Sequence, residues 1–398
     1  MATTAIPDVS TNAMRTQAAS LLVCLPSATS EEANQLRTRI LEVFPDSAVV
    51  FSGPALAEES PDVLHYPQAA HGESIWALTA KDYLAASQLA LEHSCAATLV
   101  LGAESSSLTE EALRAMFGAV SDGADLASPR YTIGPHEALV SSAVLGPMTR
   151  ALYGVTAHMP APPDACFSLK MAQRLSIVAK KPAISGPQDP LLWPAAEAAV
   201  ASLKVQEVKV GTRTLPQPTG GDLNSLLAQV IGSLFSDAET KATFWQRARV
   251  FTPATVAAST SAPGMPAEDV EELSAMVESF RNAYDNLQEI WALVLPPQSL
   301  FRVKKISRSI PEEFVFPADL WARTVYDFLM AYHLRSINRG HLLGAFTPLY
   351  LAWVVSHLRL SRGDTALSAA HAEETDTAFV TEKPYLVSRW RWPDRFNP

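Results

Sequence analysis

The sequence contains few cysteines and few glycines. Only three cysteines occur in 398 residues (Cys24, Cys95 and Cys166), and no two of them form a Cys-x-x-Cys pair. This spacing argues against a disulfide framework and a thiolate zinc site, and it is typical of a reducing compartment. With 17 glycines and 29 prolines, the composition also excludes collagen-like and low-complexity chains.

Several catalytic and nucleotide-binding motifs are missing as well. The chain has no Gly-x-Gly-x-x-Gly, no P-loop, no Gly-x-Ser-x-Gly and no His-Glu-x-x-His. A glycine-rich phosphate loop, a nucleophile elbow and a helical zinc site are therefore not indicated.

The chain has no excess of positive charge and no long apolar run. Its 31 basic and 41 acidic residues give a net charge of −10, which argues against a dedicated nucleic-acid-binding protein. The stretch from Leu342 to Val355, interrupted by Pro348, falls short of the roughly 20 apolar residues that span a membrane. We therefore expect a cytoplasmic protein without a membrane span. Residues 1–19 are expected to form a flexible tail, and a homo-oligomer is compatible with this composition.

The first half of the chain shows the alternation of strands and helices that is typical of an α/β fold. Short apolar runs predict strands at Leu21–Leu25, Ala48–Phe51, Thr98–Leu101, Asp125–Ser128 and Val205–Val210. Helical periodicity between them predicts helices at Glu31–Val43, 73–93 and Thr109–Val120. This order predicts a parallel sheet covered by helices, with ligands bound beyond the carboxyl ends of the strands.

Beyond Asp222 the pattern becomes helical. We predict helices at Asp222–Arg249, Ala267–Leu295, Pro317–Ser336 and Arg339–Leu360, the last bent at Pro348, with a linker over 252–266. The domains are therefore expected at 20–221 and 222–360, followed by a C-terminal tail, 361–398, that packs back on the helices. The aromatic and basic end of that tail, 389–392, is of the kind that stacks on a sugar or nucleotide, but packing is the favoured interpretation.

Two residues stand where the predicted sheet opens. Glu104 follows the strand at Thr98–Leu101, where a carboxylate can hold a divalent cation or cap the following turn. Arg130 follows the strand at Asp125–Ser128, where a guanidinium can pair with a carboxylate or phosphate or lie exposed in a loop.

Several segments resemble one family of enzymes. They are Asp125–Tyr131, Gly146–Gly154, Asp222–Phe235, Phe316–Phe328, Pro348–Tyr350 and Glu382–Trp390. The chain is similar over roughly residues 20–390 to bacterial-type retaining GT-A glycosyltransferases of the mannosylglycerate and glucosylglycerate synthase type. The resemblance implies a GT-A nucleotide-sugar-binding sheet domain followed by an α-helical C-terminal region. It also implies transfer of a hexose from a nucleotide diphosphate sugar to a small acceptor such as glycerate.

Most residues that form the family's site are replaced in this sequence. Its Asp-x-Asp motif, which binds metal and donor, falls on Gly102-Ala103-Glu104, and only Asp164 remains of its glycine-rich loop. The resemblance thus implies Glu104 and Asp164 as ligands of the donor and of a divalent cation, Mg²⁺ or Mn²⁺. The acidic residue and the histidine near the family's reacting centre fall close to Leu191-Leu192 and on Gly211, and neither residue type can act as a base or ligand.

The remaining roles follow from position within the family. The loop after the Asp125 strand supplies acceptor contacts, which implies Arg130 and His136, and Lys209 and Arg213 would neutralise phosphate. We therefore expect a glycosyltransferase-like protein in which catalysis is weak or lost. The alternative is a non-catalytic pseudo-glycosyltransferase that acts in ligand sensing or protein interaction.

Overall fold

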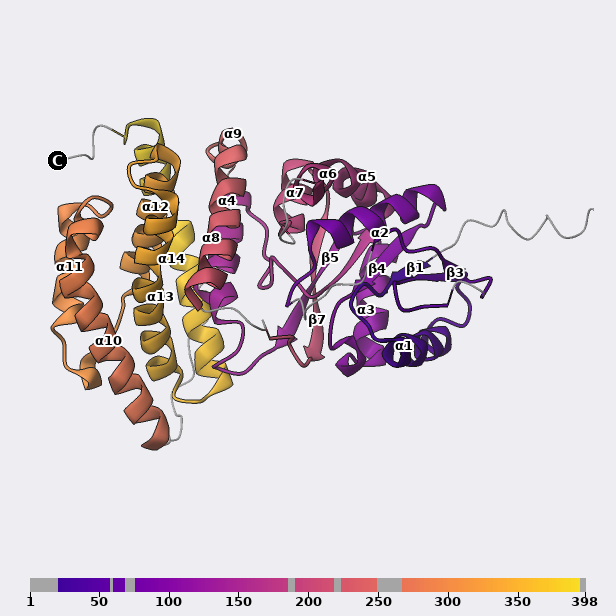
Figure 1. The fold of residues 1–398 in the computed structure, drawn as a ribbon, viewed down its shortest axis with the longest axis horizontal. Helices are drawn as coiled ribbons and strands as arrows, with labels where there is room; N and C mark the ends of the chain where they lie inside the picture. Colours follow the sequence, from indigo (N-terminus) through magenta and orange to yellow (C-terminus); the bar gives the residue numbers. More distant parts are fainter. Residues whose placement is uncertain are drawn as a thin grey trace, which may run out of the picture.

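The chain folds into a sheet region and a helical region that pack side by side (Figure 1). The computed structural model describes residues 21–57, 60–68, 76–184, 190–217, 223–248 and 267–393. We call 21–217 the sheet region and 223–393 the helical region. The predicted tail over 1–19 and the predicted linker over 252–266 lie outside the described residues.

The sheet has seven strands in the described part of the chain, in the order β3-β2-β1-β4-β6-β5-β7. The strands are β1 (Leu21–Cys24), β2 (Val49–Ser52), β3 (Val63–Leu64), β4 (Ala97–Leu101), β5 (Leu126–Thr132), β6 (Asp164–Ser168) and β7 (Val205–Thr212). β6 was not predicted, and it runs antiparallel to both β4 and β5, whereas the other pairs are parallel as expected.

Helices cover both faces of the sheet (Figure 1). The helices of the sheet region are α1 (Ser30–Val43), α2 (Ala80–Glu92), α3 (Glu110–Ser121), α4 (Gly146–Tyr153), α5 (Leu169–Val178), α6 (Lys180–Ile184) and α7 (Pro194–Val200). A 3-10 turn, η3 (Ser105–Ser107), and a π-helical turn, η4 (Ser141–Leu145), lie between them. Side chains of α1 and α3 form one core with the sheet, and those of α2 and α5 form another on the opposite face.

The helical region consists of long helices. They are α8 (Leu223–Thr240), α9 (Ala242–Trp245), α10 (Ala267–Ala292), α11 (Pro297–Ser307), α12 (Ala318–Leu334), α13 (Arg339–Ser361) and α14 (Thr365–Arg391), with a 3-10 turn, η5 (Pro311–Glu313). α14 packs against α12 and α4. The residues that we assigned to a polar tail therefore form mostly one 27-residue helix.

Two predicted boundaries in the sheet region are wrong. α2 begins at Ala80, not at residue 73, because Thr79 caps it: the side chains and backbone amides of Thr79 and Asp82 bond reciprocally. β5 continues through Pro129 to Thr132 because that proline tolerates extended backbone and its neighbours still pair with β7.

The apolar helix α13 lies in the core of the helical region. It continues through Pro348 as one 23-residue element, and it is long and apolar enough to cross a membrane. However, 72% of its most apolar window is buried inside the protein, as in a core helix.

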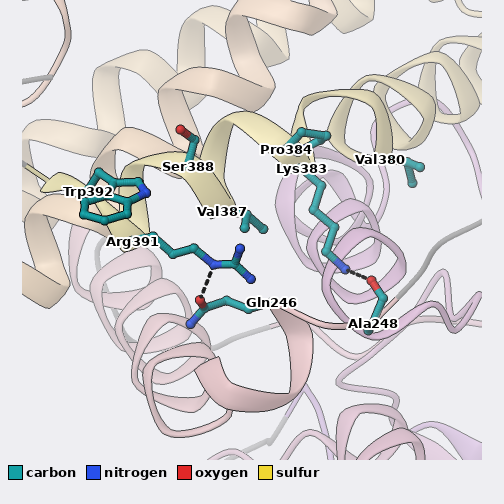
Figure 2. Close-up of a pocket in the computed structure, with 9 residues that line it drawn as sticks. All are labelled: Gln246, Ala248, Val380, Lys383, Pro384, Val387, Ser388, Arg391 and Trp392. Atoms are coloured by element: carbon teal, nitrogen blue, oxygen red, sulfur yellow. Dashed lines mark hydrogen bonds between the residues drawn. The ribbon is translucent and has the colours of Figure 1, made fainter. Parts of the chain in front are cut away.

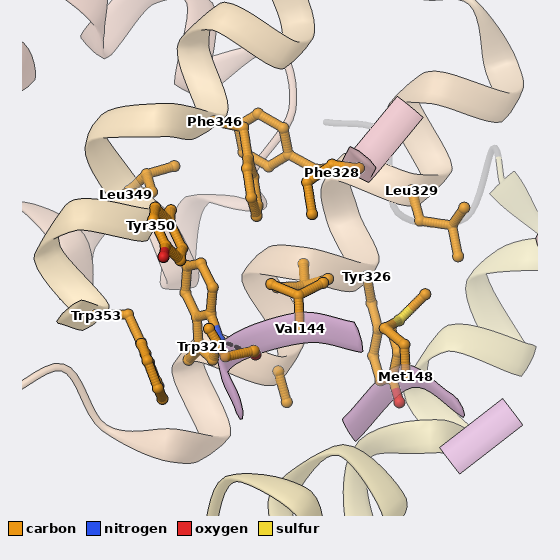
Figure 3. Close-up of a cluster of buried hydrophobic side chains, with 14 of the residues drawn as sticks. Val144, Met148, Trp321, Tyr326, Phe328, Leu329, Phe346, Leu349, Tyr350 and Trp353 are labelled. Carbon is orange, nitrogen blue, oxygen red and sulfur yellow. Dashed lines mark hydrogen bonds between the residues drawn. The ribbon is translucent and has the colours of Figure 1, made fainter. Parts of the chain in front are cut away.

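One large apolar core joins the two regions. Val144 and Met148 of the sheet region pack among aromatic side chains of α12 and α13, including Trp321 and Phe346 (Figure 3). The indole Nε1 of Trp321 donates a hydrogen bond to the carbonyl oxygen of Ala143 at 2.7 Å. The packing of the helical region therefore positions η4 and the chain that leads into it.

A buried histidine pair joins α13 to α14. The Nδ1 atoms of His357 and His371 lie 2.8 Å apart, and Nε2 of His357 contacts the hydroxyl of Ser368 at 3.0 Å. Burial, and for His357 also the neighbouring His371, lowers the pKa of His357 to about 3 and that of His371 to about 4. Both imidazoles are therefore neutral in the folded protein at neutral pH.

Acidification from pH 7.5 to pH 5 is expected to destabilise the protein through this pair. An unfolded histidine titrates near pH 6.5, so below that pH the unfolded chain binds more protons and folding stability falls with pH. At pH 5 each histidine costs about 2 kcal/mol of stability. Urea unfolding of the wild type and of the double variant His357→Leu/His371→Leu at both pH values measures this contribution.

The comparison with the double variant removes the effect of other titrating groups. One of these is Asp327, whose pKa is raised by burial to about 7 and which changes stability in the opposite direction. Equal pH dependence in the wild type and the double variant would contradict the assignment.

Candidate functional site

Asp164 is the centre of a buried polar cluster at the end of the sheet where β4 stops. It begins β6 opposite Leu101, the last residue of β4. Its Oδ2 accepts a hydrogen bond from the hydroxyl of Tyr131 at 2.7 Å, and its Oδ1 accepts one from the backbone amide of Gly102 at 3.2 Å. The side chain is fully buried, so this carboxylate depends on partners inside the protein.

Arg213 is the charged partner of Asp164. Its Nε lies 2.5 Å from Oδ2 and its Nη2 lies 2.9 Å from Oδ1, a bidentate pair in which neither side chain is exposed. Burial alone would lower the pKa of Arg213, but the charge of Asp164 and its hydrogen bonds raise it above its usual range. The guanidinium also donates to the carbonyl oxygens of Ala103 and Thr214, each at 2.6 Å.

Gly102 is enclosed at the same place. Its amide also bonds to the carbonyl oxygen of Pro163 at 2.9 Å. A Cβ atom built at Gly102 would lie 2.5 Å from that oxygen, closer than real Cβ contacts. Only glycine fits at this position while the loop that ends at Pro163 keeps its course.

Glu104 lies next to this cluster but is exposed. It has a φ of 60°, in the left-handed region, and its carbonyl oxygen accepts hydrogen bonds from the amide and hydroxyl of Ser107 at 3.1 and 2.6 Å. The backbone of Glu104, and not its side chain, therefore closes the turn η3. Its negative charge helps to raise the pKa of Arg213.

The cluster does not fit a divalent cation. Both oxygens of Asp164 already accept hydrogen bonds from Arg213, so the guanidinium stands where a shared cation would need to approach. This corrects the prediction for two residues: Asp164 is arranged as an ion-pair partner, and Arg213 neutralises Asp164 rather than a phosphate. The physical reason is that a fully buried carboxylate requires an internal counter-charge.

The other predicted residues lie apart from this cluster. Arg130 is about 40% exposed and lies 3.6 Å from Glu207, and its register partner across β5 and β7 is Lys209. Lys209 is exposed, and none of the described residues forms an ion pair with it. His136 is on the loop between β5 and η4 and lines a cavity.

The His136 cavity lies between the sheet region and the helical region and has a volume of about 280 Å³. Its walls come from the loops after β5 and β7, from η4, and from α8 and α13. The lining residues are Trp76, His136, Ala138, Leu139, Val140, Ser141, Met159, Leu215, Pro216, Gln217, Leu223, Leu226, Val230 and Tyr350. Within the part of the chain that the structure describes, no acid, lysine or arginine lines this cavity.

A second group of polar residues, which the sequence analysis missed, lies where α14 meets the sheet region. His158, Glu373 and Asp376 present ligand atoms within 4.8 Å of one another, and they are the one such group of three among the described residues. Arg150 occupies this group too: its Nη1 donates to Glu373 at 2.8 Å and to Asp376 at 3.0 Å. The group is therefore a partly buried ion-pair network in which Asp376 is the buried member, and burial raises the pKa of Asp376 to about 6.

The end of α14 borders a further cavity, of about 490 Å³ (Figure 2). Lys383 and Arg391 supply its positive charge, and Trp392 forms part of its wall. The Lys383 ammonium donates to the carbonyl oxygens of Ala248 and Leu152 at 2.8 and 3.3 Å, and burial lowers its pKa to about 8. Lys383 thus connects α14 by hydrogen bonds to the last turn of α4 and to the residues that follow α9.

Trp390, by contrast, does not face this cavity as a stacking surface. Its ring stacks on His333 with centroids 4.0 Å apart and packs edge-on against Trp245. Arg389 pairs with Asp327 inside the helical region. These two residues of the aromatic and basic end therefore serve packing.

The comparisons with known proteins give weak likenesses only. No protein-family model matches the sequence, and no curated protein is significantly similar to it. Glucosyl-3-phosphoglycerate synthase from Mycobacterium tuberculosis, in complex with Mg²⁺ and uridine diphosphate, is 13% identical with a TM-score of 0.35. The match covers 55% of this chain and 79% of that one.

Two further solved structures are similar at the same level. The same Mycobacterium tuberculosis enzyme with Mn²⁺, UDP-glucose and phosphoglyceric acid is 15% identical over 55% of this chain and 79% of that one, with a TM-score of 0.33. A structure described as a mycobacterial protein is 12% identical over 61% of this chain and 80% of that one, with a TM-score of 0.34. Likenesses of this size carry no argument about chemistry, which has to come from the geometry of the site.

Proposed function

We propose that this chain is a glycosyltransferase-like protein that binds a nucleotide diphosphate ligand without a divalent cation and in which hexosyl transfer is weak or lost. The proposal combines the sequence resemblance with a mixed sheet in which Gly102-Ala103-Glu104 directly follows β4. In sheets of this kind ligands bind beyond the carboxyl ends of the strands.

The observation that carries the proposal is the ion pair between Arg213 and Asp164. Both oxygens of Asp164 accept hydrogen bonds from Arg213, so this carboxylate beside the end of β4 is neutralised by the protein itself and is not available to a divalent cation. In hexosyl transfer the nucleoside diphosphate is the leaving group. Without a divalent cation, its developing negative charge loses several kcal/mol of stabilisation. Arg213 cannot supply this because its donors are directed to Asp164, Ala103 and Thr214.

Two other cations support phosphate binding without a metal. Arg130 and Lys209 are register partners on β5 and β7, and residues paired in this way project from the same face of a sheet. Among the described residues, Glu207 is the one ion-pair partner of Arg130, at a long distance of 3.6 Å, and Lys209 is exposed. Exposed cations of this kind bind a phosphate weakly but do not hold a leaving group rigidly for transfer.

A second candidate, protein interaction through the helical region, is favoured by exposed apolar side chains there. Leu293, just after α10, is 71% exposed, and Phe301 on α11 is 69% exposed. Side chains of this size on a surface are typical of contact sites when they occur together.

Calorimetric titration tests the proposal. UDP-glucose, UDP-mannose, GDP-glucose and GDP-mannose are added to the full chain with and without Mn²⁺. We expect at least one of them to bind, with a Kd that differs by less than about threefold between the two conditions. A parallel assay with D-glycerate should show little or no release of nucleoside diphosphate.

Either of two results contradicts the proposal. A Kd that tightens by about tenfold or more with Mn²⁺, equivalent to about 1.4 kcal/mol, would show a working cation site. If none of the four donors binds, the proposed nucleotide ligand is wrong, and protein interaction is the better candidate.

The variant Lys209→Gln tests whether the donor binds beside β7. It should weaken binding of the same donor, whereas Lys204→Gln should not.

A further inference from the structure

The geometry points to the His136 cavity as a binding site for a small uncharged ligand that has an apolar body and one hydroxyl or carbonyl group. The cavity lies at the edge where β5 and β7 end, next to the helical region. This inference goes beyond the proposed function, and its probes are different from the nucleotide sugars used there.

The charge of the described lining residues indicates the ligand's charge. Among the lining residues that the structure describes, none is an acid, a lysine or an arginine, and most are aliphatic or aromatic. An anion such as glycerate would lose its hydration here without gaining a counter-charge, which is strongly unfavourable. The acceptor class implied by the sequence resemblance therefore does not match this cavity.

Two hydroxyls in the wall, both accessible from the cavity, indicate that the ligand has a polar group. Tyr350 is 4% exposed and Ser141 is 5% exposed, and both line the cavity. Neither hydroxyl forms a hydrogen bond with any of the described residues, and neither oxygen is sealed inside the protein, so both can be reached from the cavity. A hydroxyl or carbonyl of a ligand would supply the missing partner, with the exposed ring of His136 at the same wall.

The volume sets the ligand's size. An apolar cavity of about 150 Å³ holds benzene, so one of about 280 Å³ has room for two fused rings. A bicyclic alcohol matches the cavity in size, in apolar surface and in polar group. We therefore use 2-naphthol as the probe, naphthalene as its partner without a hydroxyl, and D-glycerate as the charged comparison.

Calorimetric titration of these probes into the full chain tests the inference, with two variants on the same helix. Leu226 lines the cavity from α8, and Leu226→Trp fills it. Gln229→Trp adds the same side chain at an exposed position outside the cavity. We expect 2-naphthol to bind once per chain, to bind at least about tenfold more weakly to Leu226→Trp, and to bind unchanged to Gln229→Trp.

The variant Tyr350→Phe tests the polar contact. It should weaken 2-naphthol by about fivefold, the effect of one ordinary hydrogen bond, and leave naphthalene unchanged. Circular dichroism and the Tm confirm that each variant is folded before titration.

Several outcomes would overturn the inference. No binding of either aromatic probe would mean that water satisfies the two hydroxyls. Equal binding to Leu226→Trp and the wild type would place the probe elsewhere, and displacement of 2-naphthol by D-glycerate would show a charged ligand. If UDP-glucose and the other nucleotide sugars did not bind, the proposed function would be contradicted, but the inference about the His136 cavity would not be.

Discussion

Replacing Arg213 by alanine is expected to lower the free energy of unfolding by about 3–5 kcal/mol. The reason is that the Asp164 carboxylate, which is fully buried, would lose the two hydrogen bonds and the only opposite charge that the described residues place on it. Arg213 also holds the carbonyl oxygens of Ala103 and Thr214, so its loss would loosen the turn after β4. Urea unfolding at pH 7.5 measures the change.

The double variant Arg213→Ala/Asp164→Asn separates the lost charge partner from the lost packing. Without the buried charge, the double variant should be more stable than Arg213→Ala, so the two effects should not add. Arg114→Ala is the matched control, because its ion pair with Glu110 is about half exposed and contributes less than about 1 kcal/mol. An Arg213→Ala protein as stable as Arg114→Ala would show that Asp164 finds another partner.

Replacing Trp321 by alanine is expected to destabilise the protein by about 3–5 kcal/mol. The indole is fully buried, and it packs against Phe316, Phe346 and Trp353 with ring centroids 5.6 to 6.3 Å apart. The substitution leaves a cavity at the junction of the two regions and leaves the carbonyl oxygen of Ala143 without its donor. Thermal and urea unfolding should report the same loss.

Two variants sharpen this second test. Trp321→Phe keeps most of the ring volume but removes the hydrogen bond to Ala143, so it should cost distinctly less than alanine, about 1–3 kcal/mol. Trp392→Ala removes an indole that is 63% exposed and should change stability by less than about 1 kcal/mol. If Trp321→Ala were no worse than Trp392→Ala, the junction would not depend on this core.

The order of strands and helices could be predicted because local patterns determine it. Continuous apolar runs such as Leu21–Leu25 can be satisfied only by burial on both faces, and capping residues such as Thr109 mark helix starts. β6 was missed because Asp164–Ser168 is short and follows a proline-rich stretch, and because its pairing with β4 and β5 involves distant residues. The helical pattern of α14 was missed because its apolar residues form no clear stripe and Pro384 lies inside it.

The positions of two candidate residues could be predicted, but their contacts could not. Sequence position predicted that Glu104 follows a strand, as it follows β4, and the family resemblance suggested Asp164, which lies opposite Leu101 at the end of β4. The pairing of Asp164 with Arg213 joins residues that are far apart in the chain, and no local pattern shows which cation a buried carboxylate will take. Ser141 and Tyr350 were missed as cavity residues because one follows the sheet and the other lies on α13, and only the tertiary fold brings them together.

The close approach of Gly102 to Pro163 also limits which side chains can follow β4. An aspartate at position 102, where the resembling family has one, would bring a Cβ atom to 2.5 Å from the carbonyl oxygen of Pro163. A single substitution to aspartate at position 102 therefore does not create an acidic site, because its Cβ atom clashes with the loop that ends at Pro163. The loop that ends at Pro163 must move first, and Arg213 must also release Asp164. Two acidic cation ligands at this strand end would thus require coordinated changes in three separate segments, namely the residues after β4, the loop before β6 and the residues after β7.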